Sequence, residues 1–334
     1  MKIRLNVFFR SDILKKIVTL ILTIILGVNT IGCNIISSSK GVKIISGNSL
    51  DGISICKLVK KENQIEKGYK TIYTIEGNEK NLEKSLNNKE FDIALVPTDM
   101  AAKIYNKNSS YQIAASIGQG SYYLVTSDPS ITGFNSTLIN KEVALIQENS
   151  MIDTTVKAIL KENNVDESLV NYKYTNTAPE LVTELALGKV RTGIVPETSL
   201  ATLLYKHSGL KILSSTNKAY EEAFSILGGY PQFSVIVKKD FAKENKEYVD
   251  TFLLNLKESI DFVNDNPLQA GAYGEELNIP IKPQVLSRAI KRCNLEFILV
   301  DEFKKNYEEY FNILYNYNNE AVGGTVPDES IYYK

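Results

Sequence analysis

Short apolar runs alternate with amphipathic segments along the first two thirds of the chain. The apolar run at residues 42–46 is followed by Asn48 and Ser49 and then by a segment with helical spacing. A second strand-like segment and a second helix lead to the apolar run at residues 93–97. Because apolar runs that alternate with helices indicate parallel β-α-β units, this order predicts a sheet with helices on its faces.

The same order of elements occurs twice along the chain. The matching segments are residues 42–51 with 143–152, at an offset of 101, and residues 91–102 with 190–201, at an offset of 99. In the first pair Asn48-Ser49 aligns with Asn149-Ser150, and in the second pair a Val-Pro dipeptide recurs. This internal repeat predicts two similar α/β halves.

Each half places polar residues directly after its strands. In a parallel sheet the carboxyl ends of the strands and the N-termini of the following helices share one edge, where ligands bind. The residues expected at this edge are Asn48, Ser49, Thr98 and Asp99 in the first half and Asn149, Ser150 and Glu197 in the second. Helix capping is the alternative role for the Asn-Ser pairs, and stabilisation of a helix N-terminus is the alternative for the acids.

Two segments rich in β-forming residues, Ser121–Thr126 and Phe233–Lys238, follow the two halves. If both run between two lobes, they form a two-strand hinge. We therefore predict an α/β protein in which lobe 1 comprises residues 42–125 and 233–334, and lobe 2 comprises residues 126–232.

Two long amphipathic helices are predicted after the second crossing. Asp240 is placed to cap the first helix, which is expected to end at Asn266-Pro267. Aromatic residues between Phe303 and Phe311 keep helical spacing in the second helix. We interpret these aromatic side chains as part of the hydrophobic core rather than as a cofactor site.

The composition argues against several functions. The 38 basic and 39 acidic residues give a formal net charge of -1, which does not favour a nucleic-acid partner. One histidine, His207, and three cysteines leave few soft ligands for a four-ligand zinc site, and a Cys/His catalytic pair would have to use His207. We therefore expect no metal, no cofactor and no enzymatic activity. Cys56 and Cys293 either form a disulfide or remain buried thiols.

The N-terminal segment has the order of a secretory signal. A basic region precedes an apolar run at residues 17–26, which is shorter than the roughly twenty residues that span a bilayer. Small residues before Cys33 resemble a bacterial lipobox. We expect residues 1–32 to be a signal peptide, Cys33 to carry a lipid anchor and residues 33–41 to be a tether. The protein would then lie outside the cytoplasm, anchored to the bacterial cell membrane; a single uncleaved anchor helix is the alternative.

Several short motifs occur in an order that is typical of one family. They lie at residues 91–105, 177–204, 228–232, 266–267, 292–294 and 323–333. In this order they resemble the extracytoplasmic solute-binding proteins of ABC importers, in particular the nitrate/sulfonate/taurine and thiamine-pyrimidine group. The resemblance implies a bilobal periplasmic-binding-protein (Venus flytrap) fold with two Rossmann-like lobes. It also implies a monomer that binds a small-molecule solute between the lobes and delivers it to an ABC permease in the membrane.

Two acids suggest the chemistry of the solute. Asp99 and Glu197 follow equivalent Val-Pro strand ends and are expected to enter the space between the lobes from opposite sides. Two carboxylates brought together repel unless a ligand offsets their charge, so a bare anion is disfavoured, with Arg292 as the exception. We predict an amine-bearing or heteroaromatic solute, such as a vitamin precursor. The family often has Pro-Glu-Pro where this chain has Thr198 after Glu197.

Three further residues are candidate ligand contacts. Gln119 lies between two glycines that permit close approach of the backbone, and Tyr230 offers a flat ring for stacking. Asn294 belongs to one of the stretches that carry the resemblance. The alternative to transport is a sensor or surface lipoprotein with the same fold. Pyrimidine-synthesising enzymes share this fold but need a cysteine-rich iron-binding stretch and histidines, which this chain lacks.

Overall fold

The computed structural model describes residues 40–60, 65–206 and 209–334. The expected signal peptide at residues 1–32, the expected lipidation site Cys33 and the single histidine, His207, lie outside the described residues. The first strand begins at Lys40, so the last two residues of the expected tether belong to that strand. No helix within the described ranges is both long and apolar enough to cross a bilayer.

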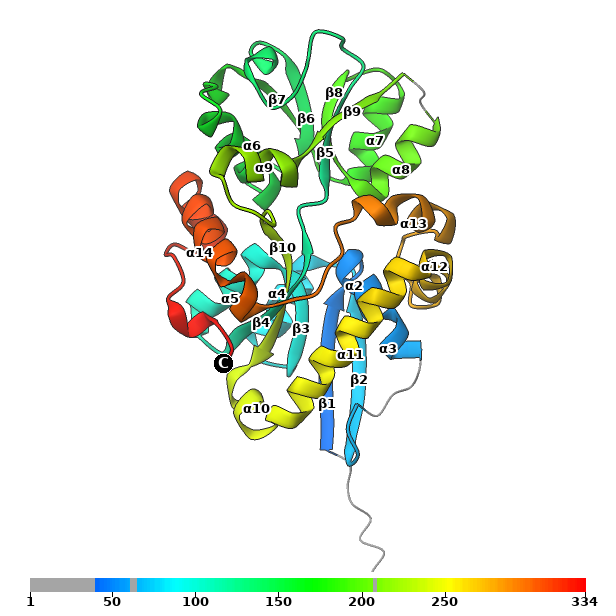
Figure 1. The fold of residues 1–334 in the computed structure, drawn as a ribbon, viewed down its shortest axis with the longest axis vertical. Helices are drawn as coiled ribbons and strands as arrows, with labels where there is room; N and C mark the ends of the chain where they lie inside the picture. Colours follow the sequence, from blue (N-terminus) through cyan, green and yellow to red (C-terminus); the bar gives the residue numbers. More distant parts are fainter. Residues whose placement is uncertain (1–39, 61–64, 207–208) are drawn as a thin grey trace, which may run out of the picture. The chain divides into compact units, whose positions relative to one another are not determined.

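The first sheet has six strands (Figure 1). They are β1 (Lys40–Gly47), β2 (Tyr69–Glu76), β3 (Ile93–Pro97), β4 (Tyr111–Gln119), β10 (Pro231–Lys238) and β11 (Ile298–Leu299). Their spatial order is β11-β4-β10-β3-β1-β2. β3 runs parallel to β1, whereas β10 is antiparallel to both β3 and β4. We call this sheet and the helices packed on it lobe 1.

The second sheet has five strands, and we call it and its helices lobe 2. The strands are β5 (Tyr122–Thr126), β6 (Glu142–Ile146), β7 (Asn171–Thr175), β8 (Thr192–Pro196) and β9 (Lys211–Ser215). Their spatial order is β7-β6-β8-β5-β9. β6 is parallel to β7 and β8, and β5 is antiparallel to β8 and β9.

The repeated halves of the sequence form equivalent elements of the two lobes. The helices of the first half are α2 (Leu50–Ser54), α3 (Cys56–Lys60), α4 (Glu79–Asn87) and α5 (Thr98–Asn108). Those of the second are α6 (Met151–Glu162), α7 (Ala178–Ala186) and α8 (Glu197–Lys206). Buried leucines one turn apart, Leu82 and Leu86 on α4 and Leu181 and Leu185 on α7, hold each helix against the apolar core. The predicted α/β fold with two related halves is confirmed.

The two crossing strands differ in one respect from the prediction. β5 pairs with β8 from Tyr122 opposite Pro196 to Thr126 opposite Thr192, so residues 122–125 belong to the second sheet rather than to lobe 1. The hydrogen bonds of the full-length antiparallel pairing determine this assignment. The chain crosses from lobe 1 to lobe 2 at Gly120-Ser121, between β4 and β5, and returns to lobe 1 just before β10. In lobe 2 the strand after the first crossing, β5, pairs with β8. In lobe 1 the strand after the return crossing, β10, pairs with β3.

The remaining helices surround these sheets. They are α9 (Thr216–Phe224), α10 (Lys239–Glu244), α11 (Lys246–Asp265), α12 (Pro267–Glu276), α13 (Pro283–Ala289) and α14 (Val300–Tyr317). Short 3-10 helices are η2 (Ser136–Leu138), η3 (Glu167–Leu169), η4 (Ile290–Arg292), η5 (Asn319–Val322) and η6 (Glu329–Ile331). Asp240 lies in the first turn of α10 instead of capping it, and Asn245 separates α10 from α11. The predicted single helix is therefore two helices.

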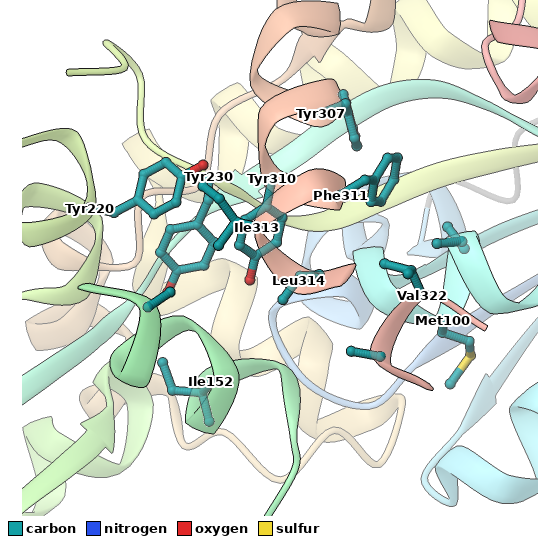
Figure 2. Packing of buried hydrophobic residues seen from close by; sticks show 14 of the residues in the cluster. Met100, Ile152, Tyr220, Tyr230, Tyr307, Tyr310, Phe311, Ile313, Leu314 and Val322 are labelled. Atoms are coloured by element: carbon teal, nitrogen blue, oxygen red, sulfur yellow. The ribbon is translucent and has the colours of Figure 1, made fainter. Parts of the chain in front are cut away.

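One hydrophobic cluster extends through both lobes. It contains Met100 of α5 and Tyr310 of α14 together with Ile152 of α6 and Tyr220 of α9 (Figure 2). Tyr310 also forms a hydrogen bond with Thr155 of α6, with an oxygen-to-oxygen distance of 2.7 Å. The aromatic residues of α14 are thus core residues, as predicted from their spacing, and Tyr310 joins the two lobes.

Candidate functional site

The strand ends of lobe 1 define one edge of the candidate site. Because β10 is antiparallel to both of its neighbours, β3 and β4 run in the same direction and their carboxyl ends share an edge. Thr98 and Asp99 follow β3, and Gln119 ends β4. One strand lies between them, so these ends are about 10 Å apart, twice the usual spacing of neighbouring strands.

Lobe 2 presents an equivalent edge. β6 and β8 are parallel, so Asn149-Ser150 and Glu197 follow strands that end on the same side. Tyr122, the first residue of β5, pairs with Pro196 at this edge. Gly120 and Ser121 connect it directly to the end of β4, so the chain itself brings the two edges together.

Asp51 is a buried acid at the lobe 1 edge that was not among the predicted site residues. Its side chain is 2% exposed and accepts hydrogen bonds from the N–H groups of Ser49 and Gly52 and from the Ser49 hydroxyl. Burial raises the pKa of Asp51, and these hydrogen bonds act in the opposite direction. Asp51 therefore holds the loop between β1 and α2 in place and brings negative charge to the edge.

Glu79 and Asp99 add two more carboxylates. Burial raises the pKa of Glu79, and the charges of Asp99 and Asp51 raise it further. Glu79 is nevertheless an exposed residue, so we infer that its carboxyl lies where nearby protein atoms limit hydration without covering the whole side chain. Asp99 is bound to Lys103, with 2.9 Å between Oδ2 and Nζ. The edge thus holds three acids, Asp51, Glu79 and Asp99, with Lys103 beside two of them.

Tyr122 brings lobe 2 near these acids. Burial raises the pKa of the Tyr122 hydroxyl to about 12, and the charges of Glu79 and Asp99 contribute to the rise. A phenol ring beside carboxylates suits a positively charged or amine-bearing group, which can lie against the ring while its N–H groups bind the acids. Within the described residues, no group of three or more His, Cys, Asp or Glu could hold a metal ion.

Glu197 differs from the prediction that it faces Asp99 as a second free acid. Its carboxylate is fully buried, and its Oε1 atom lies 2.6 Å from Nη2 of Arg292. Burial raises the pKa of Glu197, while the Arg292 guanidinium acts to lower it. Its backbone N–H donates to the Ser121 carbonyl at 2.9 Å. Arg292 is 95 residues away in the sequence, so the residue that neutralises Glu197 was not apparent from the local motif.

The two Asn-Ser pairs are not equivalent. Ser150 caps α6 by accepting from the Asp153 N–H at 3.3 Å, and Asn149 adopts a left-handed backbone with φ of 61°. Ser49 makes no side-chain cap and instead donates to Asp51. The Asn48 side chain packs against Gly77, where an added Cβ would lie 2.7 Å from its Nδ2. Helix capping therefore explains the position of Ser150. It does not explain Ser49, whose polar groups lie with those of Asn48 near the lobe 1 edge.

Thr98 lies inside lobe 1. It is fully buried, and its hydroxyl lies 2.7 Å from that of Ser234 on β10. Ser234 in turn contacts the Tyr307 hydroxyl at 2.8 Å. This chain of hydroxyl groups satisfies Thr98 within the core, so Thr98 anchors α5 to the sheet rather than presenting its hydroxyl at the edge.

Gln119, Asn294 and Tyr230 meet at the crossing. Asn294 accepts from the Gln119 N–H at 3.0 Å and donates from Nδ2 to the Gly120 carbonyl at 2.6 Å. Tyr230 is buried, and its ring stacks on Tyr310 with centroids 4.9 Å apart. A Cβ on Gly120 would lie 2.3 Å from the Tyr230 ring, so this glycine permits close approach of Tyr230. Tyr230 is part of the packing at the crossing in this structure.

A separate cavity of about 480 Å³ adjoins the lobe 2 edge. Its lining includes Asn149, Asp153, Lys157, Tyr172, Tyr174 and Tyr317. Of the predicted site residues that the structure describes, only Asn149 lines this cavity. The cavity is therefore distinct from the acidic edge and the crossing, where most of the predicted residues lie. Cys56 and Cys293 are both buried free thiols, which resolves the alternative left open by the sequence.

The sequence matches no family model and no curated protein. Solved structures, in contrast, match over most of the chain. The structure of an ABC transporter protein from Parabacteroides distasonis has a TM-score of 0.74 at 21% identity, covering 88% of this chain and 99% of that chain. The periplasmic aliphatic sulphonate binding protein SsuA from Escherichia coli has a TM-score of 0.73 at 10% identity, covering 88% and 92%. The fold of this chain is thus that of the periplasmic binding proteins.

The fold also occurs outside bacteria. A Candida albicans gene product, described as exhibiting the generic periplasmic binding protein structural fold, matches with a TM-score of 0.54 at 13% identity. It covers 87% of this chain and 93% of its own. These matches show the arrangement of the elements.

Proposed function

We propose that this protein is the solute-binding component of an ABC importer. The observation that carries the proposal is the match of 88% of the chain to the ABC transporter protein from Parabacteroides distasonis and to SsuA. In addition, the polar strand ends of the two lobes lie on either side of the short crossing at Gly120-Ser121. The protein binds and releases its solute without chemical change, and it acts outside the cytoplasm.

The solute in this proposal carries an amine or is a nitrogen heterocycle. Asp51, Glu79 and Asp99 concentrate negative charge at the lobe 1 edge, and Tyr122 adds an aromatic ring from lobe 2. A sulfonate would be repelled by these acids. The sulphonate specificity of SsuA is therefore not assigned to this chain, in spite of the shared fold.

Closure of the lobes follows from this arrangement. A solute that contacts lobe 1 acids and a lobe 2 ring at the same time binds the closed arrangement more tightly than an open one. Only this difference in affinity can shift the population toward closure. The closed surface is what an ABC permease recognises in this proposal.

The N-terminal segment supplies the remaining parts of the proposal. Residues 1–32 direct export, and Cys33 holds the monomeric protein at the membrane through its lipid. A sensor or surface lipoprotein with the same fold is the second candidate. Loss of solute uptake in cells that lack this protein would favour transport over sensing.

A thermal-shift experiment tests the solute class. The full chain, purified in detergent, is heated with spermidine, thiamine or cytosine and, in parallel, with ethanesulfonate or nitrate. A ligand at one hundred times its Kd stabilises the native state by about 2.7 kcal/mol, which raises Tm measurably. We expect shifts from the amine-bearing compounds. Shifts from the oxyanions alone would overturn the proposed solute class.

A further inference from the structure

Three side chains near the crossing have buried polar atoms with no hydrogen-bond partner among the described residues. These atoms are Nε2 of Gln119, Oε2 of Glu197 and Nε of Arg292. Gln119 is 4% exposed and Glu197 is 1% exposed, so bulk water does not readily supply the missing partners. Buried amide and charged groups are normally satisfied, and unsatisfied ones call for a specific explanation.

All three residues are attached to the same short segment of chain. Gln119 begins it, and the Glu197 N–H donates to the carbonyl of Ser121, two residues later. Asn294, two residues from Arg292, is hydrogen-bonded to the backbones of Gln119 and Gly120. Glu197 and Arg292 also contact each other directly. Their free atoms therefore belong to one small region at the junction of the lobes.

Other buried polar atoms also have no hydrogen-bond partner among the described residues. They include a carboxylate oxygen of Glu66 as well as single neutral hydroxyls such as Ser259 Oγ and Tyr220 OH. At the crossing, by contrast, an ion pair makes one hydrogen bond and leaves an atom of each partner unused. An ionised group that lacks a partner is more costly to bury than a hydroxyl.

The free atoms define what can bind to them. Arg292 Nε and Gln119 Nε2 are donors, so they require an acceptor, while Glu197 Oε2 requires a donor. A bare anion would meet the unused oxygen of Glu197, and a bare cation would meet the unused nitrogen of Arg292. The pair has no net charge, so a neutral group with a donor next to an acceptor satisfies both residues without repulsion.

We propose that Gln119, Glu197 and Arg292 bind a neutral carboxamide or cyclic amide edge of the solute. This inference rests on the proposed function and specifies the solute at the same site. The carboxyl ends of β3 and β4 are about 10 Å apart, which is the scale of a small heterocycle with an amine substituent. The amine group lies toward Asp99, and the amide edge lies toward Gln119.

A matched set of pyridines tests the amide edge. Nicotinamide, nicotinate and 3-picolylamine share one ring and carry a neutral amide, an anion and a cation, respectively. We expect nicotinamide to bind the full chain at least tenfold more tightly than nicotinate, as measured by thermal shift and by calorimetry. Equal binding of the amide and the acid, or binding of neither, would overturn the inference.

The variant Q119M separates ligand binding from folding. Methionine has nearly the same length but has no unsatisfied donor, so the unliganded Tm should stay the same or rise. Nicotinamide affinity should fall at least tenfold, which corresponds to about 1.4 kcal/mol. The exposed Gln269 provides the control Q269M, which should change neither quantity. Unchanged nicotinamide affinity in Q119M would contradict the inference.

The outcomes for the inference and for the proposed function are distinguishable. Spermidine binding should depend on Asp99 and not on Gln119. If D99N weakens spermidine binding while nicotinamide shows no dependence on Gln119, the proposed function stands and the amide inference fails. If neither spermidine nor the other amines bind, the proposed solute class fails as well.

Discussion

Arg292 Nη2 lies 2.6 Å from Glu197 Oε1, and this contact joins the 3-10 helix after α13 to the first residue of α8. The Glu197 side chain is fully buried, whereas Arg292 leaves 37% of its side chain exposed. Burial raises the pKa of Glu197, and the Arg292 guanidinium acts in the opposite direction. The ion pair therefore links lobe 1 to lobe 2.

The substitution R292M should destabilise the protein by leaving the Glu197 charge without a partner. We expect a loss of about 1–3 kcal/mol in the free energy of unfolding, below the usual cost for a fully buried pair because Arg292 is partly exposed. The double variant R292M/E197Q, which removes the buried charge, should recover part of this loss. Urea unfolding at pH 7 measures both variants. A double variant no more stable than R292M would contradict this explanation.

Gly120 should be sensitive to any side chain. An added Cβ would lie 2.3 Å from the Tyr230 ring, which is itself buried and stacked on Tyr310. We expect G120A to lower the free energy of unfolding by about 1–3 kcal/mol, the usual cost of overpacking. At Gly133 the nearest atom would be 3.5 Å away, so G133A serves as the control. Similar stability of the two variants in urea would show that Tyr230 can move aside.

Asp99 should affect amine binding without affecting folding. Both Asp99 and Asp261 pair with a lysine one helical turn away, and Asp261 lies on the exposed face of α11. D99N should weaken the binding of an amine-bearing solute about tenfold, or about 1.4 kcal/mol, whereas D261N should not. Calorimetric titration with spermidine compares the two variants. Equal affinities would indicate that Asp99 only stabilises the N-terminus of α5.

The pH dependence of stability should identify Glu79. Its pKa in the folded protein is raised above the ordinary value of 4.5 by burial and by Asp99 and Asp51. A raised pKa means that the native state holds the proton more tightly, so the stability contributed by Glu79 is complete at low pH and is lost as pH rises through the folded pKa.

The variant E79Q removes this titration. Relative to the wild-type protein, E79Q should gain stability as pH increases from about 4 to 7, because only the wild type acquires the unfavourable charge. Tm measured across this range provides the comparison. A constant difference between the two proteins would show that Glu79 titrates normally. An amine-bearing solute should reduce the difference, since its charge offsets that of Glu79.

The Tyr310 hydroxyl should contribute to the contact between lobes. Y310F keeps the ring that stacks on Tyr230 but loses the hydrogen bond to Thr155 of α6. We expect a loss of about 1 kcal/mol in the free energy of unfolding. Tyr315, on the same helix, is 38% exposed and provides the control Y315F. Equal effects of the two substitutions would argue against a specific role of the Tyr310 contact.

Much of the fold was accessible from the sequence because burial leaves a periodic pattern. The apolar strands before Pro97 and Pro196 and the leucine pairs of α4 and α7 were all identified correctly. The break at Asn245 was missed, although asparagine favours helix ends over helix interiors. The assignment of Tyr122 to the second sheet depends on which strand it pairs with, and local propensity does not specify that partner.

The site was less accessible, because its chemistry depends on residues that are distant in sequence. Glu197 was correctly placed at a strand end, but its neutralisation by Arg292 requires the tertiary fold. Asp51 and Glu79 have a weak local signal, in that both lie in the first turn of a helix that follows a strand. The Val-Pro motif indicated only Asp99 and Glu197, so Asp51 and Glu79 were not predicted.

The placement of β10 between β3 and β4 has a consequence for biosynthesis. The sheet of lobe 1 remains divided until residues 231–238 have been made, whereas all five strands of lobe 2 lie between residues 122 and 215. As the chain emerges from a ribosome or a translocation channel, lobe 2 can complete its sheet first. In lobe 1 the edges of β3 and β4 remain unpaired until β10 has been synthesised. During that interval the nascent chain is most exposed to aggregation.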